Sequence, residues 1–273
     1  MVDGRVKTYP GAMNAALAEP TVGKLIREWR TRRNLSQMAL ASDSAVSTRY
    51  LSFIETGRAR PSREMVLHLA EQLDVPLRER NRLLLAAGFA PFFPQRSLED
   101  QQMTPVREAL DRLLDAHRPY PAAIVDGHWN LVAANDGIAL MTRGVAPELL
   151  EPPANVFRIA LHPEGMAPRI LNFEEWSGHV ISRVRRQAAL TGDQVMVELY
   201  EELSGYPGVS LDHVIDSSVP LVLHRLRLAD EELSFFSTVT TFGTATDITL
   251  AELSLEAFYP ADERTKRALT DGV

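Results

Sequence analysis

The sequence predicts a multidomain chain, with an all-α bundle of five helices followed by an α+β domain built on a five-stranded antiparallel sheet. Three observations support this prediction. The length of 273 residues is long for one domain. Apolar residues recur at helical spacing between residues 21 and 90, whereas strand and helix patterns are mixed after residue 105. Residues 21–90 contain 12 Lys and Arg against 7 Asp and Glu, whereas residues 91–273 contain 15 against 27.

The charge asymmetry and the composition limit the function classes. A basic module joined to an acidic one is typical of a protein whose basic part binds a polyanion and whose acidic part has a different kind of partner. The chain has no cysteine, which excludes disulfides, thiol catalysis and cysteine-ligated zinc and fits a reducing cytoplasm. No apolar run approaches the roughly 18–20 residues that span a bilayer, and residues 1–20 form a tail without a signal-peptide core. We therefore expect a cytoplasmic protein with no membrane partner.

The basic module, placed at residues 21–91, begins with an amphipathic helix whose apolar residues share one face: Val22, Leu25, Ile26 and Trp29. Four further helices follow, each opened by a capping or proline residue. They begin after Ser36, after Ser47, at Pro61-Ser62 and at Pro76, and the third and fifth helices end at Gly57 and Gly88. These five short helices predict a compact bundle.

The second and third helices and their flanks carry Leu35-Ser36-Gln37, Leu40-Ala41, Val46 to Arg58 and Pro61-Ser62. In this register they resemble the phage repressor/Cro-like (XRE) helix-turn-helix family. The resemblance implies that double-stranded DNA is a partner and that the third helix, Thr48 to about Glu55, reads it. Ala45 departs from the family, which usually has glycine in this turn; if the backbone takes a positive φ there, alanine costs about 1 kcal/mol.

A recognition helix in the major groove reads base edges with the side chains near its N-terminus. With the apolar face of the third helix turned inward, Arg49 projects outward and is flanked by Thr48, Ser52 and Phe53. The resemblance places Thr48, Arg49 and Phe53 at base-reading positions. Arginine binds O6 and N7 of guanine, and an apolar group touches the methyl group of thymine. The alternative for Phe53 is a residue at the edge of the core.

Further residues are expected to contact the DNA backbone or to fix the recognition helix. The expected phosphate contacts are Gln37, Ser47, Arg58 and Arg60. The family pattern also pairs Arg30 of the first helix with Glu55 at the end of the third. We interpret this as a structural ion pair; removing one partner of a buried pair typically costs about 3–5 kcal/mol.

The expected linker is the stretch 92–104, which contains Pro94 and many polar residues. A lead-in helix follows around Leu110 and Leu114, and it could equally serve as a dimer contact. Later elements form an α+β pattern. They are two strands around the turn Asp126-Gly127, helices over 174–190 and 193–203, and strands over 219–228, 233–242 and 246–257, with turns at 229–232 and 243–244.

This order of elements resembles a PAS-type sensor domain, whose antiparallel sheet has the strand order 2-1-5-4-3. Seven motifs carry a closer resemblance: Pro119-Tyr120-Pro121, Asn130 to Asn135, Asn155 to Arg158, His162 to Gly165, Arg169 to Phe173, Phe242 to Asp247 and Glu256 to Asp262. They are similar to the ligand-binding domain of MmyB-like regulators, here over residues 105–267, which leaves 268–273 as a tail. The resemblance implies a buried, largely apolar pocket whose best-supported ligand type is a long-chain fatty acid.

An alkyl chain gains about 0.8 kcal/mol per buried CH₂, while one polar group fixes the head. A carboxylate head favours an arginine fork, and Arg158 and Arg169 are the candidates, with His162 and Asn172 as helpers. The alternative is that these residues pin loops to helices through backbone hydrogen bonds.

The seven histidines show no metal-ligand spacing, and no catalytic motif is present, so we expect no enzyme, no metal and no cofactor besides the bound ligand. The leading hypothesis is a homodimeric transcription regulator whose acidic domain binds a small apolar or amphiphilic molecule that alters DNA binding. A second hypothesis is that the C-terminal domain binds a protein partner and has no ligand cavity. A third is a sensor enzyme or a haem protein.

Overall fold

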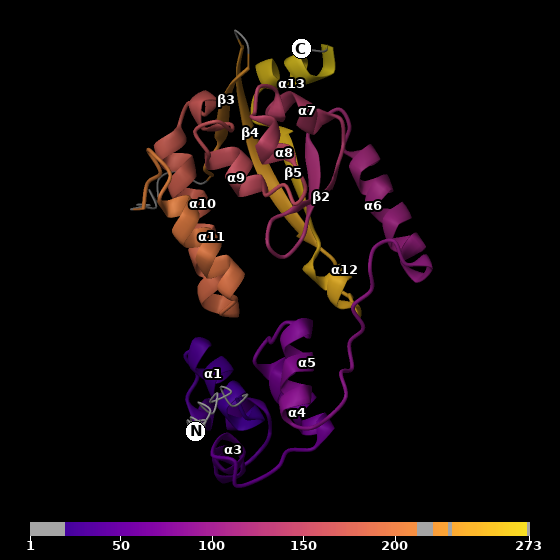
Figure 1. Cartoon of the computed structure of the whole chain (residues 1–273), viewed down its shortest axis with the longest axis vertical. Helices are drawn as coiled ribbons and strands as arrows, with labels where there is room; N and C mark the ends of the chain where they lie inside the picture. The colour runs from indigo at the N-terminus through magenta and orange to yellow at the C-terminus, as the bar shows by residue number, and fades with distance from the viewer. Residues whose placement is uncertain (1–19, 212–220, 229–230, 272–273) are drawn as a thin grey trace, which may run out of the picture. The chain divides into compact units, whose positions relative to one another are not determined.

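The computed structural model describes residues 20–211, 221–228 and 231–271, which group into two compact units. One unit comprises residues 20–75 and 79–91, and the other comprises residues 76–78 and those from 92 onward. Figure 1 shows helices alone in the first unit and a sheet with helices around it in the second. The fold class predicted from the sequence is confirmed. The finer domain boundaries stay predictions.

Five helices make up the described part of the first unit, although the first two residues of the last helix are counted with the other unit. They are α1 (Val22–Arg32), α2 (Gln37–Asp43), α3 (Thr48–Glu55), α4 (Arg63–Gln72) and α5 (Leu77–Ala86). The first four begin at N-caps whose side-chain oxygen accepts a backbone N–H, namely Thr21, Ser36, Ser47 and Ser62. Buried residues from all five helices, such as Trp29 and Leu84, form one core. Capping and apolar spacing therefore account for this bundle.

The second unit is built on an antiparallel sheet of five described strands. The strands are β1 (Ala122–Val125), β2 (Leu131–Ala134), β3 (His224–Leu228), β4 (Glu231–Thr241) and β5 (Ser254–Pro260). Their spatial order is β2-β1-β5-β4-β3, which is the predicted PAS-type order. The helical segments are η1 (Gln101–Met103), α6 (Thr104–Ala116), α7 (Gly137–Thr142), α8 (Pro147–Leu150), α9 (Val156–Leu161), η2 (Ala167–Arg169), α10 (Phe173–Thr191), α11 (Gln194–Ser204), α12 (Ile248–Glu252) and α13 (Glu263–Asp271).

The two faces of this sheet have different partners, because side chains alternate along each strand. On one face, Ile124 of β1 and Leu255 of β5 pack with Leu110 and Leu114 of α6. On the other face, Val125 packs with α9, α10 and α11, and the inner residues of β3 and β4 pack with α7 and α9. The cavity described below lies on this second face.

The predicted strand over 246–257 is wrong in its first half, because α12 occupies Ile248–Glu252 and β5 begins only at Ser254. Asp247 starts the helix: its Oδ1 accepts the N–H of Thr249 at 2.9 Å, and its Oδ2 accepts a hydrogen bond from Arg96 at 2.9 Å. Arg96 lies 151 residues earlier in the chain, so strand propensity alone could not reveal this cap.

Three other boundaries differ from the prediction. The strand expected over 219–228 begins only at His224, and residues 219–220 lie outside the described residues. Glu231 and Glu232, expected in a turn, pair with β3 as the first residues of β4. The expected tail over 268–273 is helical as far as Asp271, within α13.

Candidate functional site

The first candidate site is the exposed side of α3. The Oγ atom of Ser47 accepts the N–H of Tyr50 at 3.1 Å and so caps the helix. Thr48 and Arg49 follow in the first turn and are exposed, and the guanidinium of Arg49 lies 5.3 Å from the ring centroid of Phe53. Phe53 is half-buried, but unlike Tyr50 it is not among the described residues that pack against the core of the bundle. Arg49 and Phe53 therefore present one amphipathic surface.

A buried carboxylate holds α3 to the two preceding helices. Glu55 accepts hydrogen bonds from Nε of Arg30 at 2.7 Å and from Nη2 at 3.0 Å. Its Oε2 also accepts the side-chain amide of Gln37 at 2.7 Å. The side chain of Glu55 is only 1% exposed, and its hydrogen bonds raise the pKa of Arg30. Gln37, predicted to contact a phosphate, therefore also joins α2 to α3.

The remaining predicted DNA-contacting residues lie around α3. Arg58 and Arg60 follow the helix and are exposed, and Ser52 is half-buried within it. In the turn before α3, Ala45 has a φ of 53°, the left-handed conformation in which glycine would be unstrained. This alanine therefore carries the strain that the sequence comparison with the family anticipated.

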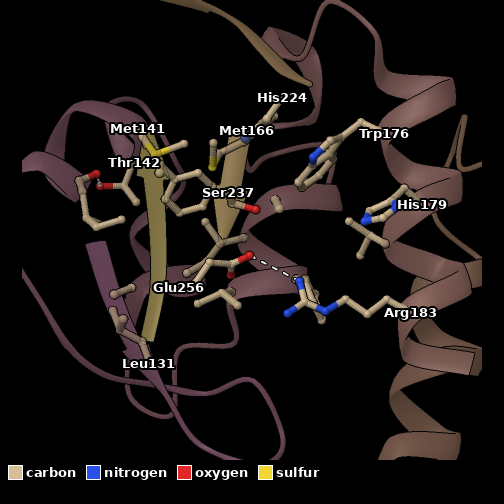
Figure 2. A pocket seen from close by; sticks show the side chains of 18 of the residues that line it. Leu131, Met141, Thr142, Met166, Trp176, His179, Arg183, His224, Ser237 and Glu256 are labelled. Carbon is tan, nitrogen blue, oxygen red and sulfur yellow. Dashed lines mark hydrogen bonds and ion pairs between the residues drawn. The ribbon is translucent and has the colours of Figure 1, made fainter. Parts of the chain in front are cut away.

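The second candidate site is a cavity of about 260 Å³ on the inner face of the sheet, beneath α7, α9 and α10 (Figure 2). Most of its wall is apolar and includes Leu131, Ile138, Met141, Ile159, Met166 and Phe258. Leu150 and Leu221 also line it and are exposed, at 39% and 48%, so they mark an opening to solvent. The expected apolar pocket is thus present.

Polar groups gather on one side of this apolar wall. Arg183 on α10 reaches Glu256 on β5, with 3.3 Å between Nη1 and Oε1, as Figure 2 shows. Ser237 on β4 also lines this side of the cavity, and its hydroxyl group favours the ionised form of Glu256. Glu256 is only 8% exposed, and burial raises the pKa of its carboxyl group although Arg183 opposes this shift. Arg183 also lies over Trp129, with 4.1 Å from Cζ to the ring centroid.

A buried histidine forms another part of the cavity wall. His224, the first residue of β3, is 4% exposed and stacks on Trp176 of α10, with 4.2 Å between ring centroids. Within the described part of the chain, neither ring nitrogen has a hydrogen-bond partner. Burial lowers the pKa of His224 to about 3, so its imidazole is neutral at pH 7.

Arg158 and His162, two of the four predicted ligand-binding residues, interact away from the cavity. Nε and Nη2 of Arg158 bind the carboxylate of Glu202 on α11 at 2.8 and 2.7 Å. This carboxylate also accepts the hydroxyl of Tyr206 at 2.6 Å, and the bond to Arg158 lowers the pKa of Glu202. Nδ1 of His162 accepts the backbone N–H of Glu164 at 3.1 Å.

Arg169 and Asn172, the other two, hold backbone segments in place. Arg169 donates to the carbonyl oxygens of Met141 and Arg143, and Asn172 donates to that of Leu223 at 2.8 Å. These contacts match the alternative in which such residues pin loops. Among the described residues that line the cavity, none of the four predicted residues is present.

The sequence prediction passed over Arg183, His224 and Glu256. A usable signal was the spacing of Trp176, Val180 and Arg183, which lie at i, i+4 and i+7 and so share one face of α10. A glutamate between Leu255 and Ala257, in a strand that reads as buried, was a second signal.

Two further findings concern the described ranges as a whole. No group of three or more His, Asp or Glu residues there is arranged to hold a metal ion. None of the helices described there is both long and apolar enough to cross a membrane.

These features define the class: a helix-turn-helix unit joined to an α+β unit with a PAS-type sheet and an apolar cavity. Residues 21–83 match the family model of a helix-turn-helix domain, and residues 106–271 match that of the MmyB-like transcription regulator ligand binding domain. The second match covers more than half of the chain, so the protein belongs to the MmyB-like transcription regulators. It is a DNA-binding transcription regulator with a ligand-binding domain.

Two solved structures are also similar to parts of the chain. The clp gene regulator ClgR from Corynebacterium glutamicum is 25% identical over 37% of this chain and 98% of its own, with a TM-score of 0.23. An RNA-binding light-oxygen-voltage receptor is 15% identical over 92% of this chain and 61% of its own, with a TM-score of 0.27. Neither TM-score is high enough to carry an argument. Among curated proteins, no significant match was found.

Proposed function

We propose that this protein binds a specific DNA sequence through α3 and that a small amphiphilic molecule, most simply a long-chain fatty acid, controls this binding from the cavity of the second unit. The observation that carries the proposal is the apolar cavity with Arg183 in its wall, in the same chain as a helix-turn-helix unit. This is a regulatory role and not a catalytic one.

The carboxylate head of the ligand is assigned to Arg183, in place of Arg158 and Arg169. Arg183 lines the cavity, whereas both other guanidinium groups already have partners outside it. A carboxylate would compete with Glu256 for Arg183. Because burial raises the pKa of Glu256, this carboxyl group can take up a proton and release the arginine, which keeps the charge of the site balanced.

On the DNA side, we propose that Thr48, Arg49 and Phe53 contact bases, because they lie on the outer side of α3. The proposed backbone contacts are Gln37, Ser47, Ser52, Arg58 and Arg60. Helix-turn-helix proteins commonly bind paired half-sites as dimers, and we propose a homodimer. The exposed Leu113 on α6 makes this helix a candidate contact between the two copies.

The cavity favours this function over a second unit that binds only a protein partner, since that alternative requires a filled core. Mass spectrometry of small molecules released from denatured, purified protein tests the choice directly. We expect a fatty acid or a related amphiphile. Release of no organic molecule, together with no binding of added dodecanoate, would contradict the ligand assignment.

Binding of dodecanoate and dodecanol to an Arg183→Gln variant tests the head-group residue. The cavity lies near the small end of the usual range for ligand pockets, which favours a chain of this length. A hydrogen bond to a charged group is worth about 1.5–3 kcal/mol, so dodecanoate should bind at least tenfold more weakly to the variant. Dodecanol, which has no carboxylate, should bind equally well to both proteins. Arg186→Gln, on an exposed part of α10, is the matched control and should change neither affinity.

A further inference from the structure

His224 is a buried polar side chain that forms no hydrogen bond with the described residues. It is 4% exposed, and its two ring nitrogens have no partner among the described residues. Its ring neighbours are Trp176, stacked at 4.2 Å, and Phe258, with 6.2 Å between centroids. Buried polar groups are normally paired, because an unpaired one loses its hydration without compensation.

A phenylalanine at position 224 would keep the stacking on Trp176 and would leave no polar atom unpaired. Packing therefore gives no reason for a histidine here. His224 is among the residues that line the cavity, so it lies next to a molecule that fills it. Neutral imidazole offers one N–H donor and one nitrogen acceptor, and a hydroxyl group complements either of them.

The sheet register separates His224 from the proposed head-group site. His224 pairs with Phe235 of β4, and Glu256 pairs with Val239 of the same strand. These positions on β4 are four residues apart, which corresponds to about 13 Å along the strand. A ligand whose carboxylate binds Arg183 would therefore meet His224 at a position well along its chain.

We propose that the natural ligand is a two-ended amphiphile: a fatty acid with a hydroxyl or carbonyl oxygen toward its far end, which hydrogen-bonds to His224. This inference rests on the proposed ligand site and adds a second specificity-determining group to it. An unsubstituted fatty acid fills the same cavity but leaves His224 unpaired.

The test compares three probes by calorimetry on the full-length protein: dodecanoic acid, 2-hydroxydodecanoic acid and 12-hydroxydodecanoic acid. A neutral hydrogen bond that replaces an unpaired group strengthens binding several-fold, up to about tenfold. We expect this gain for the 12-hydroxy acid over dodecanoic acid. The 2-hydroxy acid, whose hydroxyl lies beside the carboxylate, should show none.

The variant His224→Phe should abolish the gain, so that it binds dodecanoic and 12-hydroxydodecanoic acids equally well. The control His128→Phe makes the same change in the β1–β2 turn, outside the cavity lining, and should retain the gain. Equal affinity of the wild-type protein for dodecanoic and 12-hydroxydodecanoic acids would overturn this inference alone, and this comparison needs no variant. Survival of the gain in His224→Phe would also overturn it. Failure of all three acids to bind would overturn the proposed fatty-acid site as well.

Discussion

Each unit buries a carboxylate beside an arginine, Glu55 with Arg30 in the first and Glu256 with Arg183 in the second. Glu55 accepts hydrogen bonds from three nitrogen atoms within 3.0 Å, which come from two different helices. Arg183 lies 3.3 Å from Glu256, and both residues face a cavity. The first pair fixes helices to one another, whereas the second lies at the proposed ligand site, where a carboxylate ligand would take the place of Glu256. Under this proposal, the same residue types serve rigidity in one unit and binding in the other.

The largest expected effect is a difference in stability between loss of the Arg30–Glu55 pair and loss of the Arg183–Glu256 pair. Arg30→Met leaves Glu55 charged and buried, and it should lower the free energy of unfolding of the first unit by about 3–5 kcal/mol. Arg183→Met should cost the second unit much less, because Glu256 can bind a proton. Hydrogen exchange of the full-length protein, followed by mass spectrometry of peptides from α1 and α3 and from α10 and β5, measures both. Equal losses of stability in the two units would contradict the proposed difference between the two ion pairs.

The next effect concerns pH. The pKa of His224 is about 3 in the folded protein against an ordinary value of 6.5, so only the unfolded chain binds a proton between these values. The contribution of neutral His224 is therefore full above pH 6.5 and is lost as the pH falls toward 3, by up to about 1.4 kcal/mol per pH unit. In His224→Phe this part of the pH dependence should disappear. The variant should also be about 1–3 kcal/mol more stable at pH 7, because it leaves no imidazole unpaired. Denaturant unfolding at several pH values compares the two proteins, and parallel pH profiles would argue against a buried, neutral His224.

The two units also differ in how far the sequence predicted them. The helices of the first unit are set by local signals, such as the caps Ser36 and Ser47, and their starts were predicted closely. The cavity depends on long-range pairing. Glu256 and Arg183 are 73 residues apart in the chain. They meet only because of the register of β5 in the sheet and the rotation of α10 about its axis. Arg158 lies in the motif Asn155 to Arg158, which suggested a ligand-binding role, but its partner Glu202 is 44 residues away on another helix.

A third comparison lies within the DNA-binding unit. If Arg49 reads a base, Arg49→Ala should lose preference at one base-pair position, by about 1–3 kcal/mol. Arg58→Ala, at a proposed phosphate contact, should weaken binding equally for all sequences and reduce the salt dependence by about one counterion. Affinities for a selected operator and its single-base variants, measured at several salt concentrations, distinguish the two. If neither variant lost its preference for particular bases, the proposed role of α3 in reading the DNA sequence would be contradicted.

The smallest expected effect is at the strained turn. Ala45→Gly should relieve strain at φ 53° and stabilise the first unit by up to about 1 kcal/mol, less the added entropy of the unfolded chain. Ala39→Gly, inside α2, is the matched control and should destabilise it by about 1 kcal/mol. Hydrogen exchange in α2 and α3 measures both changes. Destabilisation by Ala45→Gly equal to that of the control would show that the turn is not strained.

The affinity of the full-length protein for its selected operator, with and without saturating 12-hydroxydodecanoic acid, most directly tests whether the second unit controls the first. Allosteric coupling of about 1–3 kcal/mol would change the DNA affinity by about 5- to 150-fold, and by reciprocity DNA would change the affinity for the acid by the same factor. We expect both changes in the wild-type protein and a much smaller DNA effect in Arg183→Gln at the same acid concentration. Identical operator affinity with the acid demonstrably bound would contradict ligand control of DNA binding.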